Sequence, residues 1–446
     1  MTRKKETICV IGMGFVGLTL ALTLAKKGFL VIGIDKSKKI IKRLKSGKAH
    51  FYEPGINQLL KKNLLEKKIF FFTKIKKNKN VKTYIITVGT PIDRNKKIVT
   101  HYIKLVAKDL NKVLENNDLV ILRSTVGVGV TRKIVFPILI SKNKKIYLSF
   151  CPERTLEGKA LRELISLPQI ISGIDKESLK KSKKIFSKLT KKIISVTDLE
   201  TAELIKLVDN SNRDVYFAYA NEIARICDSL GVSALEVIKK GKKDYPRTNL
   251  PMPGLVGGPC LEKDPYIMAE SSMIKKRIIS NITIQARRLN ENLPLEIVSY
   301  IKKFLVMKKF NIKSLKILLM GIAFKGFPKT NDTRGTVAKL VIKQIRKTFI
   351  TPKIYGFDPA VNMADIKKLK IKPVKNFNSN LKKMNLIIIL NNNPYFKRIK
   401  MNKFYNCKNL FMIYDFWSNI SQGSKEFKKS KFYISLGNHK EFKINE

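Results

Sequence analysis

Short apolar runs alternate with longer stretches of helical periodicity along most of the chain. Runs of four to six residues, almost free of charge, are typical of strands that are buried on both faces of a parallel sheet. They form one series in the first third of the chain and another in the last third. We expect strands at 8–11, 29–34, 84–88, 119–122 and 146–150, and again at 316–320, 353–357, 386–390 and 410–414.

Helical sequence separates the two series. From 198 to 230 no Gly or Pro interrupts the pattern, Asp198 is suited to cap a helix, and Gly231 is suited to end it. At 1.5 Å per residue this segment predicts a helix of roughly 45 Å. A second helical stretch, 280–308, contains Pro294, so we expect it to kink or split there.

This order of elements predicts an α/β protein with two Rossmann-like, doubly wound domains joined by a central helical domain. A length of 446 residues, with 44% hydrophobic content, fits about three domains of roughly 150 residues, each with its own core. We place the domains at 1–197, 198–312 and 313–446.

A glycine motif follows the first predicted strand. Gly12, Gly14 and Gly17 have the spacing G-x-G-x-x-G, and the second predicted strand ends in Asp35. Strand, glycine turn, helix, strand and acid form a dinucleotide-binding unit, in which the second glycine lets backbone amides approach a pyrophosphate. An aspartate accepts hydrogen bonds from a ribose 2′-hydroxyl and repels a 2′-phosphate, so NAD is favoured over NADP. The same glycines argue against a signal peptide in the charge-free run 7–25.

Polar residues follow three further predicted strands, at 89–91, 123–127 and 151–154. Open α/β sheets bind their ligands at the carboxyl ends of strands. These segments are therefore candidate ligand loops, although Gly, Pro, Ser and Thr also occur in ordinary turns.

One cysteine lies in a constrained loop. Two prolines and three glycines between 251 and 258 precede Cys260, which is followed closely by Lys263 and Asp264. Nearby cations stabilise a thiolate, which attacks carbonyl carbon, whereas most cysteines are buried and inert. The five cysteines include no Cys-x-x-Cys pair, and the three histidines are scattered, so we expect no disulfide framework, no metal site and a reducing cytoplasm.

The chain is strongly basic, with 90 Lys and Arg against 34 Asp and Glu and a net charge of +56. Only 16 of the basic residues are arginine, and the lysines are spread over nearly every segment. Nucleic-acid readers concentrate their charge and use arginine for bidentate contacts. We therefore expect neither a nucleic acid nor a membrane as partner. A basic nucleotide- or RNA-binding protein on a dehydrogenase scaffold remains the alternative of another class.

Taken together, these motifs resemble the UDP-glucose/GDP-mannose dehydrogenase family of nucleotide-sugar 6-dehydrogenases, nearly end to end. The resemblance implies an N-terminal NAD-binding domain, a central dimerisation domain and a C-terminal domain for the UDP-sugar. It also implies a homodimer, and oxidation of a sugar C6 alcohol to a carboxylate with two NAD⁺ and one water. It rests on the segments 12–17, 124–127, 152–154, 203–210, 257–265, 323–325 and 331–334.

The resemblance also assigns catalytic roles. Cys260 traps the aldehyde from the first oxidation as a thiohemiacetal, which is oxidised to a thioester that water hydrolyses. Lys206 and Asn210 stabilise the developing oxyanion. The remaining catalytic assignments are water positioning by Asp264 and Thr125 and acid–base chemistry by Glu157.

Binding roles follow in the same way. The matched cofactor contacts are Gly12, Gly14, Phe15, Val16, Gly17, Asp35, Thr90, Thr125 and Arg334, the last of which either reaches the cofactor or closes the UDP domain. The matched substrate contacts are Glu153, Arg154, Lys206, Asn210, Arg247, Gly257 and Lys325.

The sugar is open between two branches of the family. Pro-Glu-Arg at 152–154 and Tyr-Pro-Arg at 245–247 are similar to the N-acetylhexosamine branch and favour UDP-N-acetyl-D-mannosamine. Pro259, where acetamido-sugar enzymes commonly have His, and the pair Lys263 and Asp264 are closer to the UDP-glucose branch. A two-electron dehydrogenase of the hydroxyacid or 6-phosphogluconate type shares the first domain but has no need of Cys260.

Overall fold

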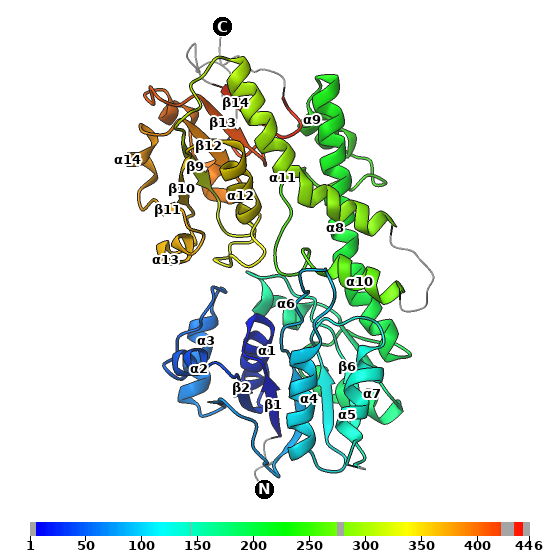
Figure 1. Ribbon diagram of the computed structural model, residues 1–446. Coiled ribbons are helices and arrows are strands. Elements are labelled where there is room, and N and C mark those ends of the chain that lie inside the picture. Colours follow the sequence, from blue (N-terminus) through cyan, green and yellow to red (C-terminus); the bar gives the residue numbers. More distant parts are fainter. Residues whose placement is uncertain (1–5, 143, 274–280, 421–431, 440–446) are drawn as a thin grey trace. The chain divides into compact units, whose positions relative to one another are not determined.

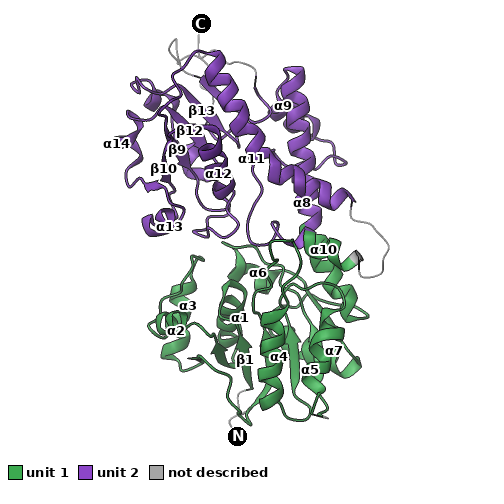
Figure 2. Cartoon of the chain, in the orientation of Figure 1, with its two compact units in different colours: residues 1–210, 266–280 green, residues 211–265, 281–446 purple. Residues whose placement is uncertain are grey.

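The computed structural model describes the chain except for residues 1–5, 143, 274–280, 421–431 and 440–446 (Figure 1). Two compact units account for the described part (Figure 2). Unit 1 comprises residues 1–210 and 266–280, and unit 2 comprises 211–265 and 281–446. The domain boundaries at 197 and 312 stay a prediction.

Unit 1 is built on an eight-stranded sheet in the order β3-β2-β1-β4-β5-β6-β7-β8. All neighbouring strands pair in parallel except β6 and β7, which pair antiparallel, a departure from the fully parallel sheet we expect. The strands are β1 (Thr7–Ile11), β2 (Leu30–Ile34), β3 (Ile69–Phe72), β4 (Val81–Ile86), β5 (Leu119–Leu122), β6 (Tyr147–Phe150), β7 (Gln169–Gly173) and β8 (Ile193–Ser195).

Both faces of this sheet are covered, as a doubly wound fold requires. Alternate residues of β1 belong to different cores: Ile8 and Val10 to one, Cys9 and Ile11 to the other. Leu18 of α1 lies in the first core, and Ile103 of α4 in the second. The helices of unit 1 that flank the sheet are α1 (Phe15–Lys26), α2 (Lys38–Lys45), α3 (Ile56–Leu65), α4 (His101–Val113), a π-helical turn (Thr131–Val135), α5 (Phe136–Ile140), α6 (Ala160–Ser166) and α7 (Lys176–Phe186).

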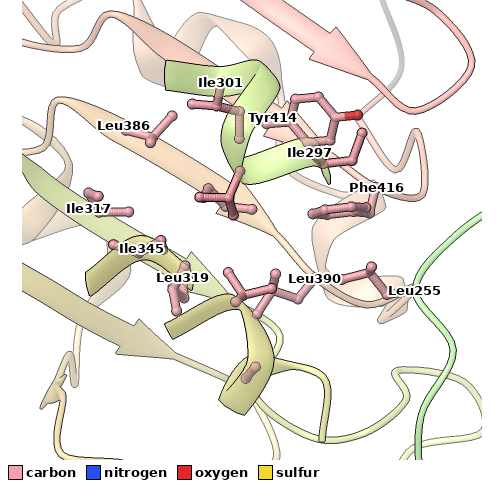
Figure 3. Packing of buried hydrophobic residues seen from close by; sticks show 14 of the residues in the cluster. Leu255, Ile297, Ile301, Ile317, Leu319, Ile345, Leu386, Leu390, Tyr414 and Phe416 are labelled. Atoms are coloured by element: carbon pink, nitrogen blue, oxygen red, sulfur yellow. The ribbon is translucent and has the colours of Figure 1, made fainter. Parts of the chain in front are cut away.

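Unit 2 contains a six-stranded parallel sheet in the order β11-β10-β9-β12-β13-β14. Alternation along β9 again divides two cores, with Ile317 and Leu319 in one and Leu318 and Met320 in the other. Figure 3 shows the first core, where Ile345 and Ile301 pack over the sheet. Its strands are β9 (Lys316–Met320), β10 (Lys353–Phe357), β11 (Lys372–Pro373), β12 (Leu386–Ile389), β13 (Met412–Asp415) and β14 (Phe432–Ser435). Its shorter helices are α12 (Ala338–Thr348), α13 (Met363–Lys367), α14 (Phe377–Leu381), α15 (Pro394–Lys397) and a 3₁₀ turn (Met401–Phe404).

Among the described residues between the two sheets in the sequence lie four helices: α8 (Leu199–Leu230), α9 (Ala234–Gly241), α10 (Asp264–Met273) and α11 (Asn281–Met307). The long helix predicted from 198 to 230 is confirmed. A split at Pro294 is wrong, because α11 continues through it. The proline lacks one hydrogen-bond donor, but it and its neighbours Leu293, Ile297 and Val298 are buried in the core, which offsets that loss. No described helix is both long enough and apolar enough to cross a membrane.

Candidate functional site

The glycine turn after β1 has the geometry of a nucleotide-binding loop. Gly12 has a φ of +96°, which favours glycine, and the hydroxyl of Thr87 donates to its carbonyl at 2.7 Å. A side chain on Gly17 would meet the Gly12 carbonyl oxygen at 1.8 Å, so only glycine allows α1 to approach the turn. At Gly14 a side chain would meet nothing within 4 Å, which leaves the first turn of α1 open to a ligand.

A cavity of about 810 Å³ lies beside this turn. Gly12, Gly14 and Asp35 line it together with Tyr102 of α4. The Asp35 carboxylate accepts hydrogen bonds from the backbone of Met13 and of Ser37, both at 2.9 Å. Each oxygen retains a lone pair for a ribose hydroxyl. The turn, the cavity and the acid therefore fit an NAD molecule.

The loops after β4 and β5 are joined at two predicted site residues. The Thr90 hydroxyl donates to the backbone carbonyl of Thr125. Gly129 and Thr131 lie a few residues after Thr125, and both bind Glu203 of α8. The Glu203 carboxylate accepts from their amides at 2.6 and 2.9 Å and from the Thr131 hydroxyl. Burial raises the pKa of Glu203 to about 7, against the opposing effect of these hydrogen bonds. Glu203 thus fastens the Thr125 loop to α8.

Lys206 and Asn210 lie on the inner face of the same helix, one turn apart. Both side chains are buried, and Lys206 is only 8% exposed, which is rare for lysine. Its charge acts on Glu153. A buried ammonium beside a buried amide is a suitable pair for a developing negative charge.

The loop after β6 is held by carboxylates. Glu153 accepts from the amides of Arg154 and Thr155 at 2.8 and 2.9 Å, and its other oxygen accepts from the guanidinium of Arg123 at 2.8 Å. Burial alone would raise the pKa of Glu153, but the charge and hydrogen bonds of Arg123 hold it below its usual value. The Gly158 amide donates to the buried Glu53 at 2.7 Å. Glu153, predicted as a substrate contact, is thus also the centre of the loop's own scaffold.

Two other predicted residues extend from this loop. Arg154 donates to the carbonyl of Pro168 at 2.8 Å and pairs with Asp209 of α8 at 3.4 Å. Glu157 is half-buried in the same loop. In unit 1, the loops that carry Thr90, Thr125, Glu153 and Arg154 are therefore connected to one another or to α8, the helix that carries Lys206 and Asn210. Sequence reasoning missed Glu53 and gave no role to Arg123 or Glu203, although both lie in predicted segments, because each acts through partners far away along the chain.

Unit 2 carries the cysteine. Cys260 is exposed, whereas Cys9, Cys151, Cys227 and Cys407 are buried. Its carbonyl accepts from the amides of Lys263 and Asp264, so the loop turns directly into α10. The Lys263 ammonium and the Asp264 carboxylate are 2.5 Å apart. Burial lowers the pKa of Lys263, but Asp264 and Cys260 raise it by more, so the lysine stays a cation beside the thiol.

The cysteine loop rests on the segment after β9. The amide of Gly258 donates to the carbonyl of Gly335 at 2.7 Å. A side chain on Gly257 would meet that same carbonyl at 2.5 Å, and one on Gly258 would meet the ring of Phe324 at 2.4 Å. These glycines therefore allow the cysteine loop to pack closely against Phe324 and Gly335, which are the sequence neighbours of the predicted site residues Lys325 and Arg334.

The remaining predicted residues of unit 2 have local partners. Lys325 lies 5.4 Å from the ring of Phe324, and the exposed Arg334 pairs with Asp332 at 2.5 Å. Arg247 is exposed, with its guanidinium 5.3 Å from the ring of Tyr245. Within the described ranges, no group of three or more His, Cys, Asp or Glu side chains is placed to hold a metal ion. The roles of all these residues stay predictions.

Three family models match the chain in sequence order. The NAD-binding domain of the UDP-glucose/GDP-mannose dehydrogenase family matches residues 6–190, its central domain 200–292 and its UDP-binding domain 318–422. The N-terminal match agrees with the glycine turn and its cavity. The C-terminal match is to the UDP-binding domain and covers most of the second sheet, which implies a UDP-sugar as substrate.

Relatives of known description are similar over most of their length. The UDP-N-acetyl-D-mannosamine dehydrogenase of Methanococcus maripaludis is 34% identical over 402 residues, which covers 89% of this chain and 88% of that protein. The corresponding enzyme of Methanocaldococcus jannaschii is 35% identical over 378 residues, covering 81% and 84%. The structure of the Pyrococcus horikoshii UDP-D-ManNAc dehydrogenase aligns with a TM-score of 0.87 at 27% identity, over 97% of this chain and 99% of that one.

These matches agree with the two Rossmann-like sheets and the helices between them. The chain belongs to the UDP-glucose/GDP-mannose dehydrogenase family and is an NAD-dependent nucleotide-sugar dehydrogenase.

Proposed function

We propose that the protein oxidises the C6 alcohol of UDP-N-acetyl-D-mannosamine to the carboxylate in two steps. The observation that carries the proposal is the exposed Cys260, on a glycine- and proline-rich loop beside the half-buried ammonium of Lys263. The relatives described as UDP-N-acetyl-D-mannosamine dehydrogenases, at 34 and 35% identity, support this sugar.

Cys260 accounts for the retention of the half-oxidised product. NAD, when bound at the glycine turn, would accept the hydride that the sugar loses in each of two oxidations. The first converts the alcohol to an aldehyde, and the Cys260 sulfur adds to its carbon to form a thiohemiacetal. Loss of the second hydride leaves a thioester, and water then releases the carboxylate and the free thiol. One alcohol and one water thus give one carboxylate, and two cofactors are reduced.

Charge stabilisation is assigned to the buried pair on α8. Each oxidation begins with loss of the hydroxyl proton, and hydrolysis passes through a tetrahedral oxyanion. The Lys206 ammonium and the Asn210 amide donate to that oxygen in a site where burial strengthens the interaction. Asp264 and Thr125 position the water, and Glu157 serves as acid–base partner.

Binding contacts complete the proposal. Gly12, Gly14, Phe15, Val16 and Gly17 form the cradle for the cofactor's pyrophosphate, and Asp35 accepts from its adenosine ribose. The further cofactor contacts are Thr90, Thr125 and Arg334, and the substrate contacts are Glu153, Arg154, Lys206, Asn210, Arg247, Gly257 and Lys325.

UDP-glucose is the second candidate substrate. Lys263 and Asp264, which form a close ion pair after the cysteine, are the pattern that favours it, together with Pro259 before the cysteine. An acetamido group needs more room and a polar partner than a hydroxyl, so the two sugars differ in the pocket they require.

A homodimer is also part of the proposal. In unit 2, α8 exposes Tyr216, Tyr219, Ile226 and Leu230 at spacings of three to seven residues along one helix, and Leu230 is 70% exposed. Such an apolar stripe on a helix is suited to a second copy of the same helix. Sedimentation at micromolar concentration tests it, since a monomer would contradict this part.

The function is tested by supplying UDP-N-acetylmannosamine, UDP-N-acetylglucosamine and UDP-glucose in turn with NAD⁺. We expect two NADH per molecule of UDP-N-acetylmannosamine and a product heavier by one oxygen and lighter by two hydrogens. Preference for UDP-glucose would replace the sugar but keep the chemistry. One NADH per sugar, undiminished in Cys260→Ala, would contradict the mechanism.

A further inference from the structure

One buried arginine grips the cysteine loop on both sides of Cys260. Arg287 of α11 donates from Nη2 to the carbonyl of Val256 at 3.2 Å and from Nη1 to the carbonyl of Leu261 at 3.1 Å. Its side chain is only 2% exposed. The two carbonyls lie four residues before and one residue after the cysteine, so a single planar group spans the segment that presents the thiol.

The charge of Arg287 is balanced within the same unit. Nη1 also donates to Asp214 of α8 at 2.8 Å, and Nε lies 3.6 Å from Glu291. Asn290 donates to the same Asp214 oxygen at 3.0 Å. Burial of an ion pair gives little net stability compared with apolar side chains of the same size. The arrangement is therefore better explained by the carbonyls it holds than by the stability of the helices.

A second buried side chain, that of Asn221, binds the same loop nearer its start. Asn221 of α8 donates to the carbonyl of Gly254 at 3.1 Å and accepts from its amide at 2.8 Å. It also donates to Asn290 at 2.9 Å, which joins it to the Arg287 network. The loop backbone is thus fixed at residues 254, 256 and 261, while the thiol between these points remains exposed.

We propose that Arg287 is a positioning residue, which holds the Cys260 loop in place so that the thiol captures the aldehyde before it is released. The inference rests on the proposed two-step oxidation. A loop held less firmly gives the same first oxidation, but the sulfur then meets the aldehyde carbon less often. The aldehyde escapes, and fewer cofactor molecules are reduced per sugar. A purely structural role would lower the amount of active protein without changing this ratio.

The experiment compares Arg287→Lys with two controls. Lysine keeps the charge, but its compact ammonium does not reproduce the planar fork that reaches both carbonyls. Arg288→Lys is the matched control, because Arg288 is the next residue on α11 and its side chain is exposed. Ile301→Val removes one methyl group from the core of the same helix and controls for lowered stability. Should the lysine variant not fold, Arg287→Met with Asp214→Leu removes the fork without leaving a lone charge between them.

Two measurements are made on each variant at a temperature well below its melting point. The first is the number of NADH per sugar consumed, with a hydrazine present to capture free aldehyde. The second is the rate of alkylation of Cys260, which native protein reports selectively because the other four cysteines are buried. For Arg287→Lys we expect released aldehyde, a ratio falling from two toward one, and kcat for the carboxylate lowered about 10- to 100-fold with KM changed less than about twofold.

The outcomes separate the two proposals. A folded Arg287→Lys or double variant with a ratio of two, no captured aldehyde and an unchanged alkylation rate would overturn the positioning role alone. A ratio of one in the unmodified protein with each of the three sugars would instead overturn the proposed function. Release of aldehyde by Arg287→Lys, and not by Arg288→Lys or Ile301→Val, supports the inference.

Discussion

Glu203 and Thr131 are joined by two hydrogen bonds, from the amide and from the hydroxyl of the threonine. The contact lies three residues before Lys206 on α8 and six residues after Thr125 in its loop. It therefore links the element that supplies the proposed oxyanion donors to a loop that supplies a proposed water-positioning residue.

The raised pKa of Glu203 predicts a pH-dependent stability. The folded protein holds the Glu203 proton with a pKa of about 7, against a usual pKa of 4.5. The stability that this proton contributes to the free energy of unfolding is therefore complete below about pH 4.5 and is lost as the pH rises through 7. Glu203→Gln, which stays neutral, should gain stability relative to the unmodified protein by about 2 to 3 kcal/mol between about pH 5 and 8. Urea unfolding of both proteins at about pH 5 and about pH 8 measures this difference. An equal change in the free energy of unfolding of the two proteins between these pH values would contradict the prediction.

Replacing Cys260 should abolish carboxylate formation. Cys260→Ser retains a hydroxyl, which is a weaker nucleophile and a poorer leaving group, so we expect kcat for the carboxylate to fall at least about 100-fold, or about 3 kcal/mol in barrier height. Cys227→Ala, at a buried cysteine of the same unit, is the control. Mass measurement of the protein after rapid quenching should show a sugar adduct only when Cys260 is present.

Asp35 should determine the choice of cofactor. Asp35→Asn removes the charge that repels a 2′-phosphate, while Lys36 and Lys74 line the same cavity and are suited to receive it. We expect kcat/KM for NAD to fall about tenfold and that for NADP to rise, and an arginine introduced nearby should increase the change. Asp109→Asn, on α4 at the same cavity, is the control. An unchanged preference would mean that Asp35 does not meet the ribose.

The buried pair of Arg123 and Glu153 should be sensitive to loss of one partner. Arg123→Met leaves Glu153 as an uncompensated charge, and we expect a loss of about 3 to 5 kcal/mol in the free energy of unfolding. Adding Glu153→Gln removes that charge and should recover part of the loss. Denaturant unfolding of both single variants and the double variant gives the coupling, and purely additive effects would contradict the pairing.

Salt should stabilise the protein. At a net charge of +56 the folded chain repels itself, and counterions screen that repulsion over about 10 Å at 0.1 M salt. We expect the melting temperature to rise by several degrees from low to moderate salt. A flat profile would indicate that the lysines lie too far apart to interact.

Local sequence was enough for nine of the fourteen described strands and for the glycine turn, whereas β3, β7, β8, β11 and β14 were not predicted. The predicted strands were recognisable because both faces of each sheet are covered, which requires continuous apolar runs such as 119–122 and 386–389. The turn at Gly12 was predictable because a positive φ and a close helix approach exclude side chains at fixed spacing. Cys260 was recognisable for a similar reason, since the prolines and glycines that constrain its loop are its neighbours along the chain.

Only the tertiary structure decided which charged residues build the site's support. Arg287 reaches a loop 26 to 31 residues before it, Glu203 a loop more than 70 residues away, and Arg123 a carboxylate 30 residues away. In a chain with 90 basic residues, no local pattern separates the buried Arg123 and Arg287 from the many solvated lysines and arginines. Their partners come together only when strands and helices pack, because the free energy of burying a charge depends on the groups that surround it in space.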